Sequence, residues 1–180
     1  MNSKNKNILI IAGEASGDLH GSLLIHKIKA IAPEVNFYGI GGDRMVNEGL
    51  NLSFHVNQMA FLGFVEVIKH IPFIKKVQNE LLSLIKEKEI GTAILIDYPG
   101  FNLNFAKKLK ALNLKIIYYI SPQIWAWGKG RIKKIKRLVD KMLVVFPFEE
   151  KLYKKEGIDC EFVGHPLIEI LNNYNFLSWE

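Results

Sequence analysis

Short runs of apolar residues alternate along the chain with longer stretches in which apolar residues recur every three or four positions. Consecutive Ile, Val, Leu and Tyr residues bounded by turn-forming residues predict strands, and the three-to-four spacing predicts helices. The predicted strands cover residues 7–12, 36–40, 92–97, 115–120, 141–146 and 160–163, and the predicted helices cover residues 19–32, 65–89, 101–112, 129–139 and 148–156.

Strand and helix alternate almost throughout, and this order predicts right-handed βαβ units. Several strands, Ile8 to Ala12 among them, are apolar at consecutive positions, as a sheet covered on both faces requires. The expected fold class is therefore α/β, with a Rossmann-like parallel sheet and helices on both faces. Pro72 is expected to break or kink the long helical stretch, leaving a helix from about Phe73. The inward side of that helix is predicted to carry Val77, Leu81, Leu84 and Ile85.

The composition favours one packed globular domain, because the 180 residues are 49% apolar and 23% charged. The longest uninterrupted apolar stretches reach seven residues, at 59–65, against about 18 for a membrane-spanning helix. The start of the chain lacks the apolar core of a signal peptide, and the single cysteine, Cys160, cannot form an internal disulfide. These features predict a cytoplasmic chain without a spanning helix.

The net charge of +6 comes entirely from the second part of the chain. Residues 1–100 carry 10 Lys and Arg against 10 Asp and Glu, whereas residues 101–180 carry 14 against 8. Seven cations gather between Lys129 and Lys141, opposed locally only by Asp140. Such a block is typical of a surface that meets nucleic acid, anionic lipid or phosphate, although a solvated helix face has the same composition.

Most of the unusual residues follow directly after predicted strands. Ligands of an open parallel sheet bind at the carboxyl ends of its strands, beside the point where the strand order reverses, so these segments form the candidate site. They are residues 13–18, 39–43, 97–102, 121–127, 147–150 and 164–166.

Two glycine-containing segments at this edge have backbone groups suited to a polar ligand. Residues 13–18 open the first predicted helix, where free N–H groups favour an anion, but they match neither the GxGxxG nor the GxxxxGK[ST] phosphate-binding pattern. The alternative is a tight turn in which Ser16 or Asp18 caps the helix. Residues 39–42 contain three glycines, which permit close backbone approach or a positive φ.

Asp97 is the best catalytic candidate by position, because it ends an apolar strand and precedes a helix that begins near Phe101. A carboxylate there either caps the helix or faces the ligand crevice as a general base. A base benefits from a raised pKa, which an apolar rim formed by Tyr98 and Phe101 would supply.

The histidines show no metal-ligand spacing, and no Asp-x-Asp pair or Cys/His cluster is present, so no metal site and no cofactor are expected. His165 follows the last predicted strand and is expected to contact a ligand or a domain hinge. The remaining histidines are interpreted as surface or helix residues without a nearby partner set: His20, His26, His55 and His70.

Trp125 and Trp127 lie on a strand-end loop just before the basic block. They are either lids over the core or stacking platforms for a sugar or a base. Basic residues with neighbouring aromatics also occur in nucleic-acid binders, but the chain carries no recognised nucleic-acid-reading motif.

Seven ordered segments together resemble the N-terminal half of the lipid-A-disaccharide synthase family, membrane-associated glycosyltransferases with two Rossmann domains (the GT-B fold). The resemblance covers about residues 7–170. Each segment alone is a weak signal, whereas seven in the same order are specific. The segments are GEASGD (13–18), GIGGDRM (39–45), MAFLGFVEV (59–67), IDYPGFN (96–102), YISPQIWAW (119–127), PFE (147–149) and FVGHPL (162–167).

The resemblance implies transfer of 2,3-diacylglucosamine from its UDP donor to the 6-hydroxyl of 2,3-diacylglucosamine 1-phosphate, with inversion, without a metal and with release of UDP. It assigns the role of catalytic base to Asp97. The residues then expected to contact substrate are Gly13, Glu14, Ser16, Gly17, Asp18, Met59, Glu66, Asn102, Ser121, Gln123, Trp125 and His165.

Acylated substrates imply an anionic membrane surface as a partner, at the inner face of the cytoplasmic membrane. The apolar segments at 59–65 and 71–74 lie beside Lys69, Lys75 and Lys76 and are expected to form a lipid-facing surface. The alternative for each apolar residue is an ordinary core helix. Nucleic acid is not expected as a partner.

In this family the nucleotide-sugar is held mainly by the C-terminal domain. We therefore expect residues 1–180 to form one acceptor-side domain of an incomplete enzyme, with residues 164–180 beginning the connection to a donor domain. Two other functions remain open from the residues alone. One is a different UDP-sugar transferase or epimerase of the same fold, and the other is a non-catalytic basic module that binds anionic membrane or nucleic acid.

Overall fold

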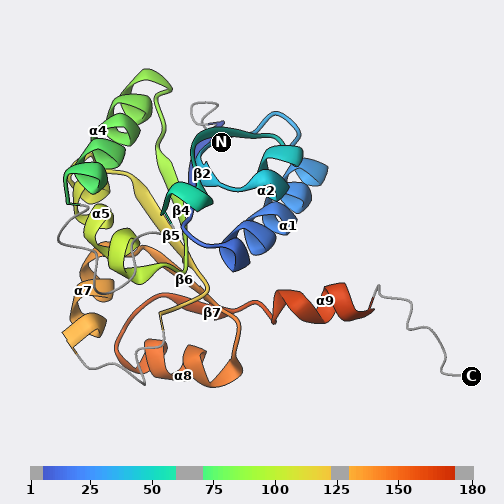
Figure 1. Cartoon of the computed structure of the whole chain (residues 1–180). Helices are drawn as coiled ribbons and strands as arrows, with labels where there is room; N and C mark the ends of the chain where they lie inside the picture. The colour runs from blue at the N-terminus through green and yellow to red at the C-terminus, as the bar shows by residue number, and fades with distance from the viewer. Residues whose placement is uncertain (1–5, 60–70, 123–129, 173–180) are drawn as a thin grey trace, which may run out of the picture.

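The computed structural model describes residues 6–59, 71–122 and 130–172 and contains one seven-stranded parallel sheet (Figure 1). The strand order across the sheet is β3-β2-β1-β4-β5-β6-β7, and every pair of neighbours is parallel. The strands are β1 (Asn7–Ala12), β2 (Asn36–Gly41), β3 (Leu50–His55), β4 (Thr92–Ile96), β5 (Lys115–Tyr119), β6 (Lys141–Val144) and β7 (Cys160–Phe162).

Helices cover both faces of this sheet, which confirms the expected α/β class. Figure 1 shows α1 and α2 on one side and α4, α5 and α7 on the other, while α9 leads away from the sheet. The helices are α1 (Ala15–Ile31), α2 (Asp43–Asn47), α3 (Val56–Met59), α4 (Ile71–Glu87), α5 (Pro99–Ala111), α7 (Gly130–Leu138), α8 (Pro147–Lys155) and α9 (Pro166–Asn172).

The consecutive apolar residues of β1 are explained by two separate hydrophobic cores. Leu9 and Ile11 pack into the core beneath α4, α5 and α7, whereas Ile10 and Ala12 pack into the core beneath α1 and α2. Successive side chains of a strand point to opposite faces, so a strand covered on both sides needs apolar residues at every position. The same alternation between cores continues in β4, the neighbour of β1.

Gly39 allows β2 to pair closely with β1. It has a φ of +139°, and a Cβ atom there would lie 2.2 Å from the carbonyl oxygen of Ile10. The register between β2 and β3 also shifts between Gly39 and Ile40. A side chain at residue 39 is therefore excluded both by backbone conformation and by the neighbouring strand.

The observed elements differ from the predicted ones mainly at their starts and at one strand. α1 begins at Ala15, four residues before its predicted start, and α4 begins at Ile71, so that Pro72 lies in its first turn. Proline is well tolerated there because the first N–H groups of a helix have no intrahelical acceptor. The edge strand β3 and the short helices α2, α3 and α9 were not predicted.

Within the three described ranges, no helix is both long enough and apolar enough to cross a membrane. Among the helices of these ranges, α1 and α4 are the longest, with 17 residues each.

Candidate active site

The order of strands reverses between β1 and β4. From β1 the chain adds β2 and β3 on one side, and from β4 it adds β5, β6 and β7 on the other. Ala12, the last residue of β1, pairs with Ile96, the last residue of β4. Gly13 and Glu14 therefore emerge beside Asp97, at the position where open parallel sheets bind their ligands.

Asp97 is half-buried at this edge, and burial is the main reason that its pKa is raised to about 6. The negative charge of Glu14 raises the pKa of Asp97 further, while a hydrogen bond from the backbone N–H of Tyr98 opposes the shift. Glu14 itself is exposed and directly precedes α1. A carboxylate with a pKa near neutrality is suited to accept a proton from a substrate hydroxyl.

Tyr98 covers the end of β1 and requires the absence of a side chain at Gly13. A Cβ atom on Gly13 would lie 2.2 Å from Cδ1 of the Tyr98 ring. The ring stacks on Phe101 with 6.1 Å between centroids, and the hydroxyl donates to the carbonyl of Met59 at 3.2 Å. Burial raises the pKa of Tyr98 to about 12. Tyr98 and Phe101 thus lie at the end of β4 as an apolar rim beside Asp97.

Asn102 lies directly behind Asp97 and is fully buried. Its side-chain amide donates to the carbonyl oxygens of Asp97 at 2.8 Å and of Ile96 at 3.2 Å. These contacts join the first turn of α5 to the end of β4. The expected substrate contact of Asn102 stays a prediction, because its described partners are the carbonyls of Ile96 and Asp97 and the side chain of Tyr118.

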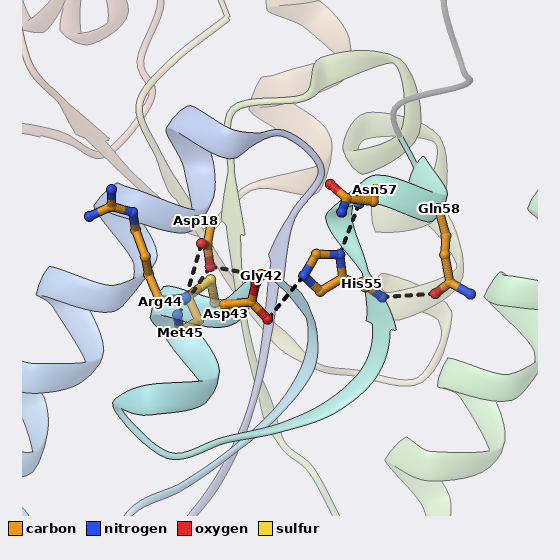
Figure 2. A network of polar contacts seen from close by, with 8 residues as sticks. All are labelled: Asp18, Gly42, Asp43, Arg44, Met45, His55, Asn57 and Gln58. Carbon is orange, nitrogen blue, oxygen red and sulfur yellow. Dashed lines mark hydrogen bonds and ion pairs between the residues drawn. The ribbon is translucent and has the colours of Figure 1, made fainter.

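Asp18 connects α1 to the start of α2, as Figure 2 shows. Its carboxylate is buried and accepts hydrogen bonds from the backbone N–H groups of Gly42 at 2.7 Å, Arg44 at 3.2 Å and Met45 at 3.1 Å. These are N–H groups that the first turn of a helix leaves without intrahelical acceptors. Asp18 thus caps α2 from another helix, whereas the sequence offered only a cap of its own helix.

Gly17 and Ser16 occupy the first turn of α1 in different environments. Gly17 is buried and packs closely against Ala12. A Cβ atom added to Gly17 would lie 3.1 Å from the Cβ of Ala12. Ser16 is exposed. The predicted substrate contacts of Gly13, Glu14, Ser16, Gly17 and Asp18 stay predictions; the structure places Glu14 and Ser16 at the surface of this edge.

His55 has a set of partners, contrary to the interpretation of this residue as an isolated histidine (Figure 2). Its Nδ1 accepts from the N–H of Asn57 at 3.2 Å, and its Nε2 lies 3.5 Å from Asp43. Its own backbone N–H donates to Gln58 at 2.9 Å. Asp43 is 12 residues away in the sequence and on another element, so sequence spacing gave no signal for this contact.

Ser121 lies two residues after β5 and is buried against Glu149, which the sequence analysis included in a candidate segment but did not name as a site residue. The Ser121 hydroxyl donates to Glu149 at 2.6 Å, and the second oxygen of Glu149 accepts from the N–H of Phe146 at 3.4 Å. Glu149 is 3% exposed, so this hydrogen-bonded pair fixes the start of α8 against β5. A glutamate three residues after the N-cap, here Phe146, is the sequence signal that would have identified it.

His165 lies in the segment between β7 and α9 and packs against two rings. Its ring contacts Phe146 with 5.6 Å between centroids and His20 edge-on with 6.4 Å. Burial, together with the neighbouring His165, lowers the pKa of His20. His20 was expected to lack a partner, and this contact corrects that expectation. His165 also lines an open pocket of about 520 Å³, whose lining includes Leu23, Tyr119 and Ile168.

Three expected substrate contacts, Glu66, Gln123 and Trp125, lie outside the described residues, as does Trp127. Among the side chains that the structure does describe, no group of three or more His, Cys, Asp or Glu residues is arranged to hold a metal ion.

Comparison with known proteins identifies the family of this chain. The family described as lipid-A-disaccharide synthetase matches residues 8–176. The chain is 49% identical over 165 residues to a lipid-A-disaccharide synthase of Geobacter metallireducens, covering 92% of this chain and 43% of the relative. It is 44% identical over 162 residues to the synthase of Myxococcus xanthus, covering 90% and 42%, and 45% identical over 163 residues to that of Coxiella burnetii, covering 91% and 43%.

The match is extensive along this chain but partial along its relatives. The family match includes every strand of the sheet except the first residue of β1, and it includes both sides of the reversal point. The chain spans about 43% of the length of the curated relatives. With 44–49% identity across nine-tenths of its residues, the chain belongs to the lipid-A-disaccharide synthetase family.

Proposed function

We propose that this chain provides the acceptor side of a lipid-A-disaccharide synthase. The reaction transfers 2,3-diacylglucosamine from its UDP donor to the 6-hydroxyl of 2,3-diacylglucosamine 1-phosphate and releases UDP. The observation that carries the proposal is Asp97, half-buried at the reversal point with a pKa of about 6, in a chain of this family.

The proposed chemistry is a single displacement at the anomeric carbon of the donor. Asp97 accepts the proton of the 6-hydroxyl as its oxygen bonds to that carbon, and the bond to the UDP oxygen breaks with inversion. UDP departs as an anion, so hydrogen-bond donors and positive groups can stabilise it in place of a protonating acid and without a metal. The Tyr98–Phe101 rim supports this role, because partial exclusion of water keeps the pKa of Asp97 high.

Residues that border Asp97 complete the proposed acceptor site. Glu14 and Ser16 are exposed at the start of α1, beside Asp97, and are suited to hydrogen-bond the hydroxyl groups of a sugar. His165 lies farther along the same edge, before α9. We propose that residues 164–172 begin the connection to the part of the enzyme that holds the donor.

The same proposal includes association with an anionic membrane surface through α7. Its cations carry no ion pair to any carboxylate in the described part of the chain, and the positive charges of Lys107, Arg131 and Arg137 help burial to lower the pKa of Lys134. An uncompensated cluster of this kind attracts anionic headgroups. The cations of α7 are Arg131, Lys133, Lys134, Lys136 and Arg137.

The apolar segment at the start of α4 divides between core and surface. Phe73 contacts Phe54 edge-on with 6.2 Å between centroids, and Ile74 packs against the same core. Ile71 is 42% exposed and lies beside the exposed Lys75. Of the two segments expected to meet lipid, the described part therefore offers Ile71, and most of the other segment lies outside the described residues.

Substitution of Asp97 by Asn tests the proposed base in the enzyme expressed from its complete reading frame. We expect disaccharide formation from UDP-diacylglucosamine and diacylglucosamine 1-phosphate to fall by at least about 100-fold, since general-base catalysis contributes about 10²–10⁴-fold. Asp159→Asn is the matched control, because Asp159 precedes β7 at the opposite edge of the sheet and pairs with Lys141 on the surface.

Near-normal turnover by Asp97→Asn would reject Asp97 as the base. In the wild-type enzyme, the acid limb of the rate profile should have a midpoint near pH 6, because the carboxylate must be ionised to accept a proton. Full activity in excess EDTA and a β-linked product by proton NMR test metal independence and inversion. Another UDP-sugar transferase of the same fold would instead turn over only unacylated sugar acceptors.

A further inference from the structure

The backbone at the proposed base is held in an unusual conformation. Asp97 and Tyr98 have φ angles of 42° and 45°, in the left-handed region. Two successive residues other than glycine in this region are uncommon, and such a conformation persists only where surrounding contacts hold it. The feature to explain is therefore what fixes the peptide of Asp97.

Two fully buried side chains bind the carbonyl oxygen of Asp97. The Tyr118 hydroxyl donates to it at 2.5 Å, and the Asn102 amide donates to it at 2.8 Å. Both residues are 0% exposed. The two lone pairs of this carbonyl oxygen are thus both engaged, from β5 on one side and from α5 on the other.

The other backbone group of Asp97 is fixed as well. Its N–H donates to the carbonyl of Tyr119 at 3.0 Å, beyond the last regular pair of β4 and β5. Two adjacent residues of β5 therefore bind the two backbone groups of Asp97. The carbonyl of Tyr119 accepts from its N–H, and the hydroxyl of Tyr118 donates to its carbonyl oxygen. The carboxyl group of Asp97 is the part of the residue that these contacts leave to face the site.

The chemistry of both side chains keeps them as hydrogen-bond donors to the Asp97 carbonyl. Burial and the nearby charge of Asp97 raise the pKa of Tyr118 well above its usual value, so its hydroxyl stays protonated and remains a donor. The Oδ1 atom of Asn102 has no hydrogen-bond partner among the described residues although it is buried. A buried polar group left unpaired lowers stability, so the Asn102 side chain is placed for what its NH₂ group binds.

We propose that Tyr118 and Asn102 are positioning residues that fix the left-handed backbone of Asp97 and thereby hold its carboxyl group in the half-buried place beside Glu14. The proposal rests on the proposed function of Asp97 as base. Neither side chain contacts substrate in this role, since both are fully buried. Loss of either donor frees the Asp97 peptide to return to an ordinary conformation, in which its carboxyl group gains water.

The Tyr118→Phe and Asn102→Leu variants test this role by two readouts. In the 180-residue chain, the carboxyl carbon of Asp97 is titrated by NMR, and its midpoint should fall from about 6 toward the ordinary value of about 3.9. In the enzyme expressed from its complete reading frame, kcat should fall by about 10- to 100-fold, as expected for a displaced catalytic group, while KM changes by less than about twofold. The acid limb of the rate profile should move to lower pH.

Tyr153→Phe is the matched control, because Tyr153 is equally buried and its hydroxyl donates to another backbone carbonyl, that of Pro122, at 3.2 Å. It should lower the melting temperature without changing the titration of Asp97. If Tyr118→Phe behaves in the same way, with the midpoint near 6 or higher and kcat unchanged, the positioning role is wrong.

Tyr118→Phe keeps the ring that fills the core, so it decides the question even if Asn102→Leu does not fold. The proposed function is tested separately. An active Asp97→Asn enzyme would show that Asp97 is not the base. The NMR titration would still show whether Tyr118 and Asn102 position its carboxyl group.

Discussion

At the residue scale, Asp97 is the candidate catalytic base, and its ionised form lowers the stability of the folded chain. Its pKa of about 6 means that the folded chain holds this proton more tightly than the unfolded chain, where an aspartate titrates at about 3.9. The bound proton stabilises the folded chain fully at pH values below the pKa of Asp97 in the unfolded chain. It is lost as the pH rises through about 6, because ionisation then leaves a half-buried charge beside Glu14.

Asp97→Asn is therefore expected to raise the melting temperature at pH 8 and to leave it nearly unchanged at pH 4, where Asp97 is mostly protonated. Asparagine keeps an oxygen that can accept the hydrogen bond from the Tyr98 N–H and carries no charge to bury. Thermal melts followed by circular dichroism at the two pH values measure the difference. Equal effects at pH 4 and pH 8, or a lower melting temperature at pH 8, would contradict the burial of an ionised carboxylate.

The position of Asp97 could be predicted from the sequence, but its conformation could not. An aspartate directly after an apolar strand lies at the ligand edge of a parallel sheet, and that reasoning needs only the strand pattern. The left-handed angles of Asp97 and Tyr98 depend on Asn102 in the first turn of α5 and on Tyr118, which pairing of β4 with β5 brings to Asp97. No spacing rule identifies a buried tyrosine as the donor to a carbonyl 21 residues away.

At the element scale, the cap of α2 is supplied by α1. We expect Asp18→Ala to lower the free energy of unfolding by about 2–3 kcal/mol, because it leaves the N–H groups of Gly42, Arg44 and Met45 without their acceptor. Asp18→Asn retains one acceptor oxygen, so its free energy of unfolding should fall by less. Ser16→Ala is the control, since Ser16 is exposed in the same helix. Urea unfolding curves measure all three.

A loss by Asp18→Ala no larger than that of Ser16→Ala would show that these hydrogen bonds do not stabilise the fold. Hydrogen exchange at residues 42–45 supplies an independent measurement, because fraying of α2 should accelerate exchange there first.

The edge strand β3 shows why element prediction failed at one place. Residues 50–55 alternate apolar and polar side chains, Leu52 is 41% exposed, and only Leu50 and Phe54 are buried within the strand. A strand at the edge of a sheet has one strand neighbour, so it needs less apolar surface than the central strands. The sequence signal that identified β1 and β4, consecutive apolar residues, is therefore absent from β3.

The helix α7 carries the membrane prediction. We expect the chain to float with vesicles containing phosphatidylglycerol and not with vesicles of phosphatidylcholine alone. The exposed pair Lys133→Glu and Lys136→Glu should weaken binding by at least about 30-fold, at about 1 kcal/mol for each lysine lost. The exposed pair Lys151→Glu and Lys155→Glu on α8 changes the net charge equally and is the control.

Equal losses in both double variants would mean that net charge alone attracts the chain. Duplex DNA is titrated at the same salt concentrations as the competing ligand. Tighter and steeply salt-dependent binding to DNA would favour a nucleic-acid module over the membrane surface.

At the scale of the whole molecule, the sheet supplies one wall of the proposed site. The 180-residue chain should therefore bind UDP weakly, with a dissociation constant above about 1 mM, equivalent to less than about 4 kcal/mol. Isothermal calorimetry with UDP measures this directly, and diacylglucosamine 1-phosphate in detergent micelles is the comparison ligand. Tight UDP binding by this chain would contradict the assignment of the described sheet to the acceptor side.

Most of the architecture could be predicted from the sequence, because the central strands of a parallel sheet covered on both faces are runs of consecutive apolar residues. What remained unpredicted depends on contacts between elements far apart in the chain. Asp18 reaches across to α2, Glu149 returns to Ser121, and His165 packs on His20. The candidate segments contained most of these residues, but the spacing along the chain does not indicate which of them contact each other, because only the assembled sheet brings them together.

The reversal point between β1 and β4 has a consequence for the order in which the chain folds. Ala12 pairs with Ile96, so closing the sheet at this point joins residues 84 positions apart, whereas β1, β2 and β3 lie within the first 55 residues. During synthesis, β1 can pair with β2 long before β4 exists, and closure of the long loop comes later. The two carboxylates of the proposed site, Glu14 and Asp97, thus first meet when the two halves of the sheet join.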